Sequence, residues 1–422
     1  MALLHNLRCF ISGSWHLITK GPRLYYAWIG FLLVLMALGA FAYANQLRHG
    51  LIVTHMRDQV SWGFYIGNFT FLVGVAAAAI MLVIPAYIYD WEPIKEITLL
   101  GELLAISALV MCLGFVMVDI GRPDRFWHIM PLVGRLNWPV SMLAWDVIVL
   151  NLYLLLNWVV VTYLLYCAYT EKHYIKSIVT PLVLLSIPMA VSIHTVTAYL
   201  YNGLAARPFW NSAILAPRFL ASAFCSGPAI LLVVLQVLRK MTKLRITDEA
   251  IHKVAELMAY TMGFNLFLTA AEAFKEFYSQ TEHVVYIKYL FFGLKGHNAL
   301  VPYAWASQIF GLAAFLLFLI PKTRKDWRTL NLGCLLIYAS VYIEKGMGLI
   351  IPGLTPDALG EIYEYTPSLT EITVAAGIFA LGFLVFTLML KAAVPMMLGE
   401  FTIRKAPGEP HLDRPGAEAS HP

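Results

Sequence analysis

The sequence predicts an all-α integral membrane protein with ten transmembrane helices. Three observations indicate this class: ten long apolar stretches, very few charges inside them, and a composition that is 60% hydrophobic and only 13% charged. The mean hydropathy is +0.70. A bilayer core about 30 Å thick requires about 20 apolar residues for each helix that crosses it. A soluble chain could not bury so much apolar surface in its interior.

The spans follow one another with short connections and leave the chain ends outside the membrane. The longest connections have about 20 residues, too few for a separate soluble domain. Residues 1–23 contain His, Arg and Lys but no uninterrupted apolar core, which predicts an amphipathic cytoplasmic lead-in and not a cleaved signal peptide. Residues 24–400 form the predicted ten-helix membrane domain, and the Pro- and Gly-rich residues 401–422 predict a disordered cytoplasmic tail. In chain order, the predicted spans are 24–46, 62–89, 98–118, 140–166, 178–201, 214–238, 254–278, 301–320, 328–350 and 371–396.

The distribution of Lys and Arg predicts that both termini face the cytoplasm. If the N-terminus lies inside, the inner segments carry 18 Lys and Arg residues and the outer loops carry nine. An excess of basic residues in short loops marks the cytoplasmic side of a membrane protein. The sequence therefore predicts a multi-pass membrane protein whose even number of spans returns the chain to the cytoplasmic side. The net charge of +5 is spread over loops and gives no indication of nucleic-acid binding.

The sequence predicts no haem, iron–sulfur cluster or other metal site in this chain. The five cysteines lie far apart, and no two of them form a C-x-x-C pair. That pair is the spacing typical of zinc sites and iron–sulfur clusters. A haem between membrane helices requires axial ligands at membrane depth, and His194 is the one histidine predicted well inside a span. No G-x-G-x-x-G motif follows a strand, so a dinucleotide fold is not expected. Electrons for any redox reaction must therefore come from a partner or from an organic carrier.

Polar side chains from four spans are predicted to meet near the outer end of spans two to five. Span two enters from outside as SWGFYIGNFTF, span three leaves with VMVDIGRPDRFW, span four re-enters with NWPVSMLAWD, and span five leaves with SIHTVTAYLYNG. An ionised side chain inside a membrane costs roughly 2.5–3.5 kcal/mol on insertion scales, so such residues usually have a function. The set consists of Asn68, Asp119, Asp146 and His194, with Trp62, Tyr65, Trp138, Trp145 and Tyr199 around it.

This combination of side chains is typical of quinone binding. A quinone has two carbonyl oxygens that require hydrogen-bond donors, and its reduction transfers protons together with electrons. Asp and His side chains supply hydrogen bonds and protons, and aromatic and aliphatic walls suit the ring and its isoprenoid tail. We therefore expect Asp119, Asp146 and His194 to contact the quinone and exchange protons. Asn68 and Tyr65 are weaker candidates.

Each of these residues also has a structural interpretation. The Trp and Tyr side chains could belong to an aromatic belt at the membrane surface. Asp119 precedes Gly-Arg-Pro and could cap a turn or pair with Arg122 or Arg125, and His194 could be a packing histidine. Asp146 is the hardest to explain structurally, because it lies in an apolar helix without a basic residue nearby in the sequence.

A second set of charged residues lies in the later spans. Ion pairs across spans seven and nine would neutralise these charges, whereas the alternative is a proton path or a second pocket. On the inner side, three polar residues of spans three and four could form an inward proton path, although packing is the favoured explanation. The second set comprises Glu272, Lys275, Glu276, Glu344 and Lys345, and the inner residues are Glu102, Asn151 and Asn157.

A weak internal repeat predicts that the helices form two four-helix bundles. At an offset of 153 residues, Phe71 and Gly74 match Phe224 and Gly227, and Asp119 matches Glu272. Spans two to five and six to nine would then be bundles of parallel topology, flanked by spans one and ten. The small residues in spans two and six could instead simply mark close helix packing.

The order of these motifs resembles the NrfD/PsrC-like family of integral membrane subunits. The motifs are SWGFYIGNFTF, DIGRP, a Trp-Asp helix, SIHTV, PFWN and APRFLASAFCSG, and the resemblance covers spans two to ten. The stretch EKGMGLIIPGLTPDALGEIYEYTPSLTE is most similar to ten-helix members, above all those of sulfite-reduction-associated Dsr complexes. Members from Qrc menaquinone reductase complexes are the next most similar.

The resemblance implies a quinone-binding subunit of a respiratory complex without haem or cluster of its own. Members of the family bind quinone at the outer end of the first bundle, against a periplasmic ferredoxin-like iron–sulfur subunit. A histidine before Gly-Arg-Pro in related subunits is replaced here by Asp119, whereas Asp146 and His194 match family positions. The implied partners are that iron–sulfur subunit, other membrane and cytochrome subunits, the menaquinone pool and the lipid bilayer.

The sequence thus favours a subunit of a menaquinol:acceptor oxidoreductase that acts in the respiration of sulfite or sulfate, with proton translocation left open. An ion or solute transporter is the first alternative, and it predicts spans interrupted by Gly or Pro near the midplane. Pro181, Pro188 and Pro228 allow this alternative. The second alternative is a purely structural anchor for redox partners, which would need neither a buried Asp146 nor a buried His194.

Overall fold

The computed structural model describes residues 2–89, 91–130, 133–281 and 283–404. Within these ranges every regular element is a helix, and ten helical segments are long and apolar enough to cross a membrane. The prediction of an all-α membrane protein with ten spans is confirmed. The spanning segments are α2 (Arg23–His49), α3 to η2 (Phe64–Ile88), α5 (Glu92–Asp119), α6 (Met142–Tyr169), α7 (Lys176–Asn202), α8 (Leu215–Met241), α9 (Asp248–Ser279), α11 (Val301–Leu319), α13 with α14 (Trp327–Leu354) and α15 (Leu369–Met397).

Two of the spans are interrupted within the membrane. One is divided at Ala77 between α3 and α4, and the other is divided at Gly346 between α13 and α14. The remaining helices are short or lie at the ends of spans. The bounds of these pieces and short helices are α1 (Ala2–Thr19), α3 (Phe64–Ala76), α4 (Ala78–Val83), η2 (Ile84–Ile88), α10 (Val284–Phe292), α12 (Pro321–Lys325), α13 (Trp327–Lys345) and α14 (Met347–Leu354).

Several helices begin where a polar side chain caps the first turn. Ser141 accepts a hydrogen bond from the backbone N–H of Ala144, and Thr247 accepts one from that of Ala250. These bonds satisfy donors that have no partner within the helix. At the start of α15, Ser368 and Glu371 form a reciprocal capping box. The sequence pattern of these caps therefore explains why α6, α9 and α15 begin where they do.

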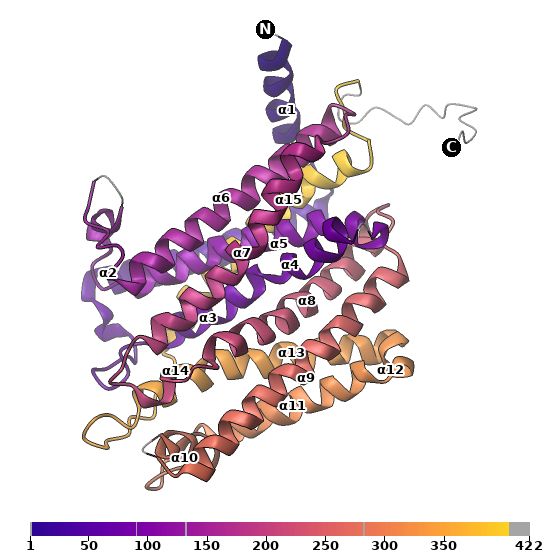
Figure 1. The fold of residues 1–422 in the computed structure, drawn as a ribbon. Helices are drawn as coiled ribbons and strands as arrows, with labels where there is room; N and C mark the ends of the chain where they lie inside the picture. Colours follow the sequence, from indigo (N-terminus) through magenta and orange to yellow (C-terminus); the bar gives the residue numbers. More distant parts are fainter. Residues whose placement is uncertain (1, 90, 131–132, 282, 405–422) are drawn as a thin grey trace.

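The helices form two neighbouring sets, which Figure 1 shows as adjacent groups of inclined helices. In the first helix set, α3 packs on α5, α5 on α6, α6 on α7 and α7 on α3. In the second helix set, α8 packs on α9, α9 on α11, α11 on α13 and α13 on α8. Contacts of α3 and α7 with α8 join the two sets, while α2 and α15 pack together and α15 also packs on α5. The grouping rests on these contacts, and the internal sequence repeat stays a prediction.

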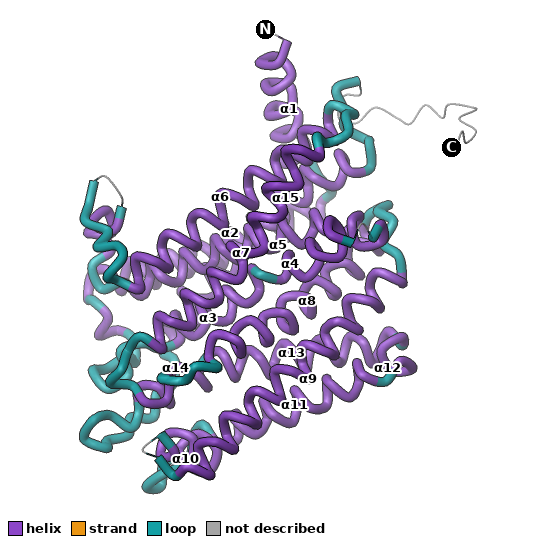
Figure 2. The backbone as a smooth tube through the Cα atoms, viewed as in Figure 1, coloured by secondary structure: helices purple, strands orange, loops and turns teal. Residues whose placement is uncertain are grey.

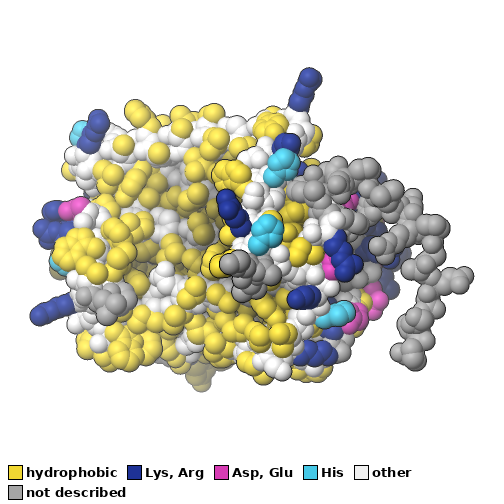
Figure 3. All heavy atoms as spheres, turned by 90° about the horizontal axis from the view of Figure 1, so that it is seen from above, with side chains coloured by type: hydrophobic (Ala, Val, Ile, Leu, Met, Phe, Trp, Pro, Cys, Tyr) yellow, Lys and Arg dark blue, Asp and Glu magenta, His cyan; other side chains and the backbone are white. Residues whose placement is uncertain are grey.

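The lipid-facing character of the surface is plain in Figure 3. Hydrophobic side chains cover much of the face that it shows, and many Lys and Arg side chains gather towards its two ends. Phe31, Val34 and Phe41 of α2 illustrate this surface, because each is a large apolar side chain that is exposed on the molecule. Such an exposed apolar belt is stable only when lipid covers it.

The two ends of the helix sets differ in what they carry. We call the end where α3 begins and α5 stops the Asp119 end. Long loops gather there, at the left of Figure 2. The opposite end carries α1 and the end of α15, which contact each other. There Ile403 donates its backbone N–H to the carbonyl of Tyr169 at 2.8 Å. The first residues of the predicted tail thus pack on α6, whereas 405–422 lie outside the described residues.

Candidate functional site

One face of α7 carries three polar side chains into the first helix set. His194, Thr197 and Tyr201 recur at intervals of three and four residues, so they lie on the same side of the helix. None of the three is exposed. The polar face of α7 therefore provides hydrogen-bonding groups where the rest of the helix interior is apolar.

Asp146 lies against this polar face. It is 1% exposed, and Thr197 Oγ1 donates a hydrogen bond to its Oδ1 at 2.8 Å. No Lys, Arg or His of the described residues forms an ion pair with it. A buried carboxyl without a charged partner is costly, since one neutral hydrogen bond replaces only part of its hydration. A purely structural role does not account for this cost.

Tyr201 lies between two of the predicted carboxyl groups. Its hydroxyl hydrogen-bonds with Thr70 of α3, and it interacts electrostatically with both Asp119 and Asp146. Its ring packs edge-on against Trp62, with ring centroids 5.6 Å apart. Tyr201 and Thr197 are not among the site residues predicted from the sequence. Their spacing from His194 along α7 is the signal that could have revealed them.

Asp119 is the last residue of α5, and its Oδ1 is buried without a hydrogen-bond partner among the described residues. Arg122 pairs with Asp124 at 3.1 Å, so it does not provide the pairing with Asp119 that the sequence left open as an alternative. Tyr65 of α3 interacts electrostatically with Asp119, and its hydroxyl donates to Gln46 Oε1 at 2.8 Å. The structure thus brings Tyr65 and Asp119 together near the end of the first set.

A groove of about 600 Å³ opens beside Asp119. Its volume lies within the range of about 300–1,000 Å³ that is typical of small-molecule sites. Gln46 lines the groove and donates from Nε2 to the carbonyl of Val118 at 2.7 Å, next to Asp119. The groove is therefore lined by the residues that directly follow Asp119 in the chain. Its lining residues are Tyr43, Gln46, Leu47, Gly50, Leu51, Ile120, Gly121, Arg122, Pro123 and Asp124.

His194 has one satisfied and one unsatisfied ring nitrogen. Nδ1 lies 2.9 Å from the carbonyl of Ala190, which can only accept, so Nδ1 carries the hydrogen. Nε2 is buried without a partner among the described residues, and in the neutral ring it is an acceptor. His194 interacts electrostatically with Lys345 of α13. His194 therefore has a buried ring nitrogen that is free to take a proton.

Asn68 and two of the surrounding aromatic residues have structural explanations. Both polar atoms of Asn68 have partners: it donates to the carbonyl of Phe64 and accepts from the hydroxyl of Tyr342, both at 2.8 Å. It thus connects α3 to α13. Trp138 and Tyr199 are 54% and 46% exposed, which favours the aromatic belt for them.

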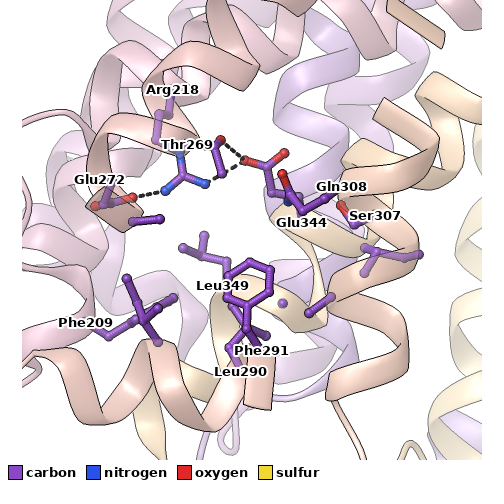
Figure 4. A pocket seen from close by; sticks show the side chains of 15 residues that line it. Phe209, Arg218, Thr269, Glu272, Leu290, Phe291, Ser307, Gln308, Glu344 and Leu349 are labelled. Carbon is purple, nitrogen blue, oxygen red and sulfur yellow. Dashed lines mark hydrogen bonds and ion pairs between the residues drawn. The ribbon is translucent and has the colours of Figure 1, made fainter. Parts of the chain in front are cut away.

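The second set of charged residues is organised by Arg218 of α8. Its guanidinium pairs with Glu272 of α9 and with Glu344 of α13, the latter at 2.6 Å, and Figure 4 shows the arginine between the two carboxylates. The expected pairing across spans seven and nine is therefore replaced by a bridge through a third helix. Lys275 pairs with its neighbour Glu276 at 2.8 Å.

Arg218 lies in the first turn of α8, within the predicted span 214–238. Its planar guanidinium group has several N–H donors and can bind two carboxylates at once. The ammonium group of a lysine lacks this geometry. A cavity of about 60 Å³ adjoins this bridge, and Figure 4 shows Ser307 and Gln308 beside Glu344 at its edge. The arrangement combines an apolar cavity with a buried ion-pair network.

On the opposite side of the first set, Glu102 differs from the two asparagines grouped with it. Asn151 is exposed and donates to the carbonyl of Val147, and Asn157 donates to that of Tyr153 at 2.7 Å. Packing explains both asparagines. Glu102 is 4% exposed and its Oε2 has no partner among the described residues.

Most of the chain matches a known family of membrane proteins. The family described as "Polysulphide reductase, NrfD" matches residues 52–357. This range contains both helix sets, the polar face of α7 and the bridge through Arg218.

Three relatives extend over most of the chain. A membrane protein of Halobacterium salinarum, named for a dimethyl sulfoxide reductase, is 26% identical over 85% of this chain and 88% of its own length. The Hdr-like menaquinol oxidoreductase integral membrane subunit of Archaeoglobus fulgidus is 24% identical over 87% and 92%. A selenate reductase subunit of Mesobacillus selenatarsenatis is 23% identical over 92% and 97%.

Proposed function

Because the chain belongs to the NrfD family of membrane proteins, we propose that it is the quinone-reactive membrane subunit of a respiratory oxidoreductase. It exchanges electrons between menaquinol or menaquinone and an iron–sulfur subunit docked at the Asp119 end. A full-length relative named as a menaquinol oxidoreductase subunit supports the choice of quinone. The Lys and Arg distribution places the Asp119 end on the periplasmic side and both termini in the cytoplasm.

The observation that carries this proposal is the set of buried polar groups around Tyr201. Asp119 Oδ1 and His194 Nε2 are buried without partners among the described residues, and Asp146 has a single neutral partner. Such atoms fit a ligand that offers hydroxyl groups, as a quinol does, because His194 Nε2 and an ionised Asp119 each accept the hydrogen bond that they lack. A structural anchor would gain nothing from leaving them unpaired.

A bound quinone supplies the two-electron and two-proton chemistry. The residues of this chain hold the ring and move protons. Asp119 directly precedes the groove residue Ile120, and its carboxyl group can take a proton and release it at the Asp119 end. Thr197 fixes Asp146 by a hydrogen bond, and the ring of Tyr201 packs against that of Trp62. His194 Nε2 can take a second proton on the side of the second helix set.

The composition of the complex follows from the resemblance described above. We propose a periplasmic ferredoxin-like iron–sulfur subunit as the electron partner, together with other membrane and cytochrome subunits. The stretch 344–371, which resembles Dsr-type members of the family, favours sulfite or sulfate respiration as the process. In this scheme the chain holds no haem or cluster, and electrons pass directly between the quinone and the docked partner.

A transporter is the second candidate, since one structural feature favours it. The span of α13 and α14 is interrupted at Gly346, and that of α3 and α4 at Ala77. Interrupted spans at membrane depth are typical of transporters and occur where backbone lines a cavity. The buried carboxyl groups near the Asp119 end favour the quinone site instead, because transporter sites usually lie at the midplane.

The first experiment is purification of the native complex through this subunit. Co-eluting proteins are identified by mass spectrometry, and quinone is extracted from the same sample. We expect an iron–sulfur protein together with menaquinone in near-stoichiometric amount. An intact preparation that contains neither would contradict the proposal and favour the transporter.

Two substitutions test the site directly. Asp146→Asn and His194→Gln keep the shape of each side chain but remove its ability to exchange a proton. We expect each variant to reduce quinol oxidation by the assembled complex by about 100-fold or more, the usual size of a general acid–base contribution. Glu249→Gln, an exposed carboxylate in the first turn of α9, is the matched control and should retain full activity. Full activity in both site variants would indicate a structural anchor.

A further inference from the structure

Lys345 occupies an unusual position at the centre of the molecule. It is the last residue of α13, directly before the interruption at Gly346, and it is 3% exposed. Its ammonium donates to the carbonyl of Phe219 at 2.6 Å and lies 4.7 Å from the centre of that ring. The C-terminal end of α13 also favours a positive charge there. These contacts hold the amine, but none of them neutralises it.

Lys345 forms no ion pair with a carboxylate of the described residues. Glu344, its neighbour in the chain, instead pairs with Arg218 and accepts from Asn265 and Thr269 at 3.2 and 3.4 Å. A buried lysine without a counter-ion is expensive within a membrane and usually marks a proton or ion path. Unlike arginine, lysine can lose its proton when it is buried.

On the side of the first helix set, Lys345 faces groups that lack partners. A Cβ atom at Gly74 of α3 would lie 3.4 Å from Lys345 Nζ and 3.5 Å from Ser226 Oγ, so the glycine leaves room for the amine. Ser226 Oγ and His194 Nε2 are both buried without partners among the described residues. His194 interacts electrostatically with Lys345. The amine is therefore coupled electrostatically to the histidine of the proposed quinone site.

On the side of the second helix set, a small cavity separates Lys345 from the bridge of Arg218 and Glu344. Its volume is about 10 Å³, and both charged side chains of the bridge line it together with Lys345 and Ser222. This is close to the smallest space, about 10–15 Å³, that holds one water molecule among polar partners. Beyond the bridge lies the cavity of about 60 Å³ shown in Figure 4, which Glu272 also lines.

We propose that Lys345 carries protons between the two helix sets. The Lys345 ammonium gives a proton through one water molecule to the Glu344 carboxylate, and the resulting amine takes a proton from the imidazolium of His194. One proton thus leaves His194 and one carboxylic acid forms at Glu344, while no electron moves. The water molecule and the Lys345 ammonium are both regenerated. This inference rests on the proposed function, because quinol oxidation is what protonates His194.

The test is an infrared difference spectrum of the assembled complex, recorded after addition of menaquinol against the oxidised state. We expect a carbonyl band of a protonated carboxylic acid that Glu344→Gln removes. Lys345→Arg keeps the positive charge and the bond to Phe219 but cannot release a proton near neutral pH. We therefore expect the Glu344 band to be absent from Lys345→Arg and from Lys345→Met, while the first turnover of quinol oxidation continues in both.

Three comparisons make the result decisive. Lys391→Arg is the matched control, since Lys391 is another lysine within a span, 5.4 Å from the ring of Tyr25 and far from the bridge in sequence. It should keep the band.

A band that persists in Lys345→Arg but not in Lys345→Met would show a structural or electrostatic role and overturn the relay. A wild-type complex that oxidises quinol without a Glu344 band would overturn it too, whereas a complex that does not oxidise quinol would contradict the proposed function itself. Size-exclusion chromatography of each assembled complex verifies that the variants fold.

Discussion

At the scale of the residue, the buried charges decide which groups are structural and which can react. Arg218 pairs with two carboxylates, and the three side chains are only 12 to 16% exposed. In contrast, His194 Nε2 and Asp119 Oδ1 have no partner among the described residues. An unsatisfied atom gains energy from a ligand or a proton, whereas a carboxylate of the bridge can take up a proton only at the cost of an ion pair. The two sets of charges predicted from the sequence therefore have different roles.

Arg218→Leu should destabilise the protein strongly. The substitution leaves two buried carboxylates without their counter-ion, which costs about 3–5 kcal/mol of unfolding free energy. Denaturant unfolding in detergent measures the loss. Replacing Glu272 and Glu344 by Gln in the same chain should recover most of it, because no uncompensated charge then remains. Arg122→Leu, at an exposed pair, is the control and should leave the unfolding midpoint unchanged. Equal midpoints for Arg218→Leu and the wild type would contradict the structural role of the bridge.

At the scale of the element, close helix packing depends on particular glycines. Gly39 of α2 and Gly377 of α15 lie at the crossing of their helices, where a Cβ at Gly39 would lie 2.7 Å from the Cα of Gly377. Gly30, also in α2, has open space around the same position. Small residues allow backbones to approach in membranes, where packing replaces the hydrophobic effect between helices. The same residue type thus has different importance at two positions of one helix.

Gly39→Ala should separate α2 from α15, whereas Gly30→Ala should not. We expect the first substitution to cost about 1–3 kcal/mol, as overpacking of an interior usually does. The second should be neutral or slightly stabilising, because alanine favours a helix more than glycine does. Thermal unfolding of both variants in the same detergent provides the comparison. A similar effect at both positions would contradict the close crossing.

A second element-scale feature is the connection before α15. The Tyr365 hydroxyl donates to Glu371 and accepts from the backbone N–H of Phe64 at 2.9 Å, so it fastens this connection to the start of α3. Burial, followed by the charge on Glu371, raises the pKa of the Tyr365 phenol above its ordinary value of 10.0. The folded protein therefore keeps this proton at a pH where the unfolded chain loses it.

Tyr365→Phe should show the pH dependence that follows. Near pH 8, the variant should be less stable by about 1–3 kcal/mol, since the backbone N–H of Phe64 loses its acceptor. The wild-type free energy of unfolding should fall as the pH rises above about 10, because the unfolded chain then releases the Tyr365 proton first. The difference between wild type and variant should therefore shrink towards about pH 11. A difference that stays constant over this range would contradict the raised pKa.

At the scale of the whole molecule, the difference between the two ends determines where a partner can dock. The polar set around Tyr201 and the groove beside Asp119 lie near one end, whereas α1 and the last turn of α15 lie at the other. The excess of Lys and Arg is on the side of the chain termini. An electron partner for the proposed quinone site must therefore dock at the Asp119 end, which the positive-inside rule predicts to lie on the outer side of the membrane.

Labelling of single cysteines tests this orientation. Cys9, the one native cysteine among the described residues that is not buried, is first replaced by Ser. We expect Asp124→Cys to react with a membrane-impermeant maleimide in intact cells that express this chain alone. Glu249→Cys, at the opposite end, should react only after the cells are opened. The reverse pattern would invert the predicted topology and place the electron partner in the cytoplasm.

Most residues of the candidate site could be predicted from the sequence, but the contacts between them could not. Asp119, Asp146 and His194 stand out as ionisable residues near or within apolar spans, and the structure places all three in the first helix set. The role of Arg218 was not foreseen, because its place near the start of a span resembles that of a loop residue. Its two partners are 54 and 126 residues away in the chain, so only folding brings them together.

The sequence by itself determined that this protein spans a membrane ten times, because span length and the cost of charge in lipid act locally along the chain. It also determined which residues are costly to bury. Only the tertiary structure decided what those residues face: Asp146 lies against Thr197, and Asn68 turns to Tyr342. It also decided that His194 of the first helix set interacts electrostatically with Lys345 of the second. Such relations depend on how helices rotate and cross as they pack, and no local pattern of residues encodes them.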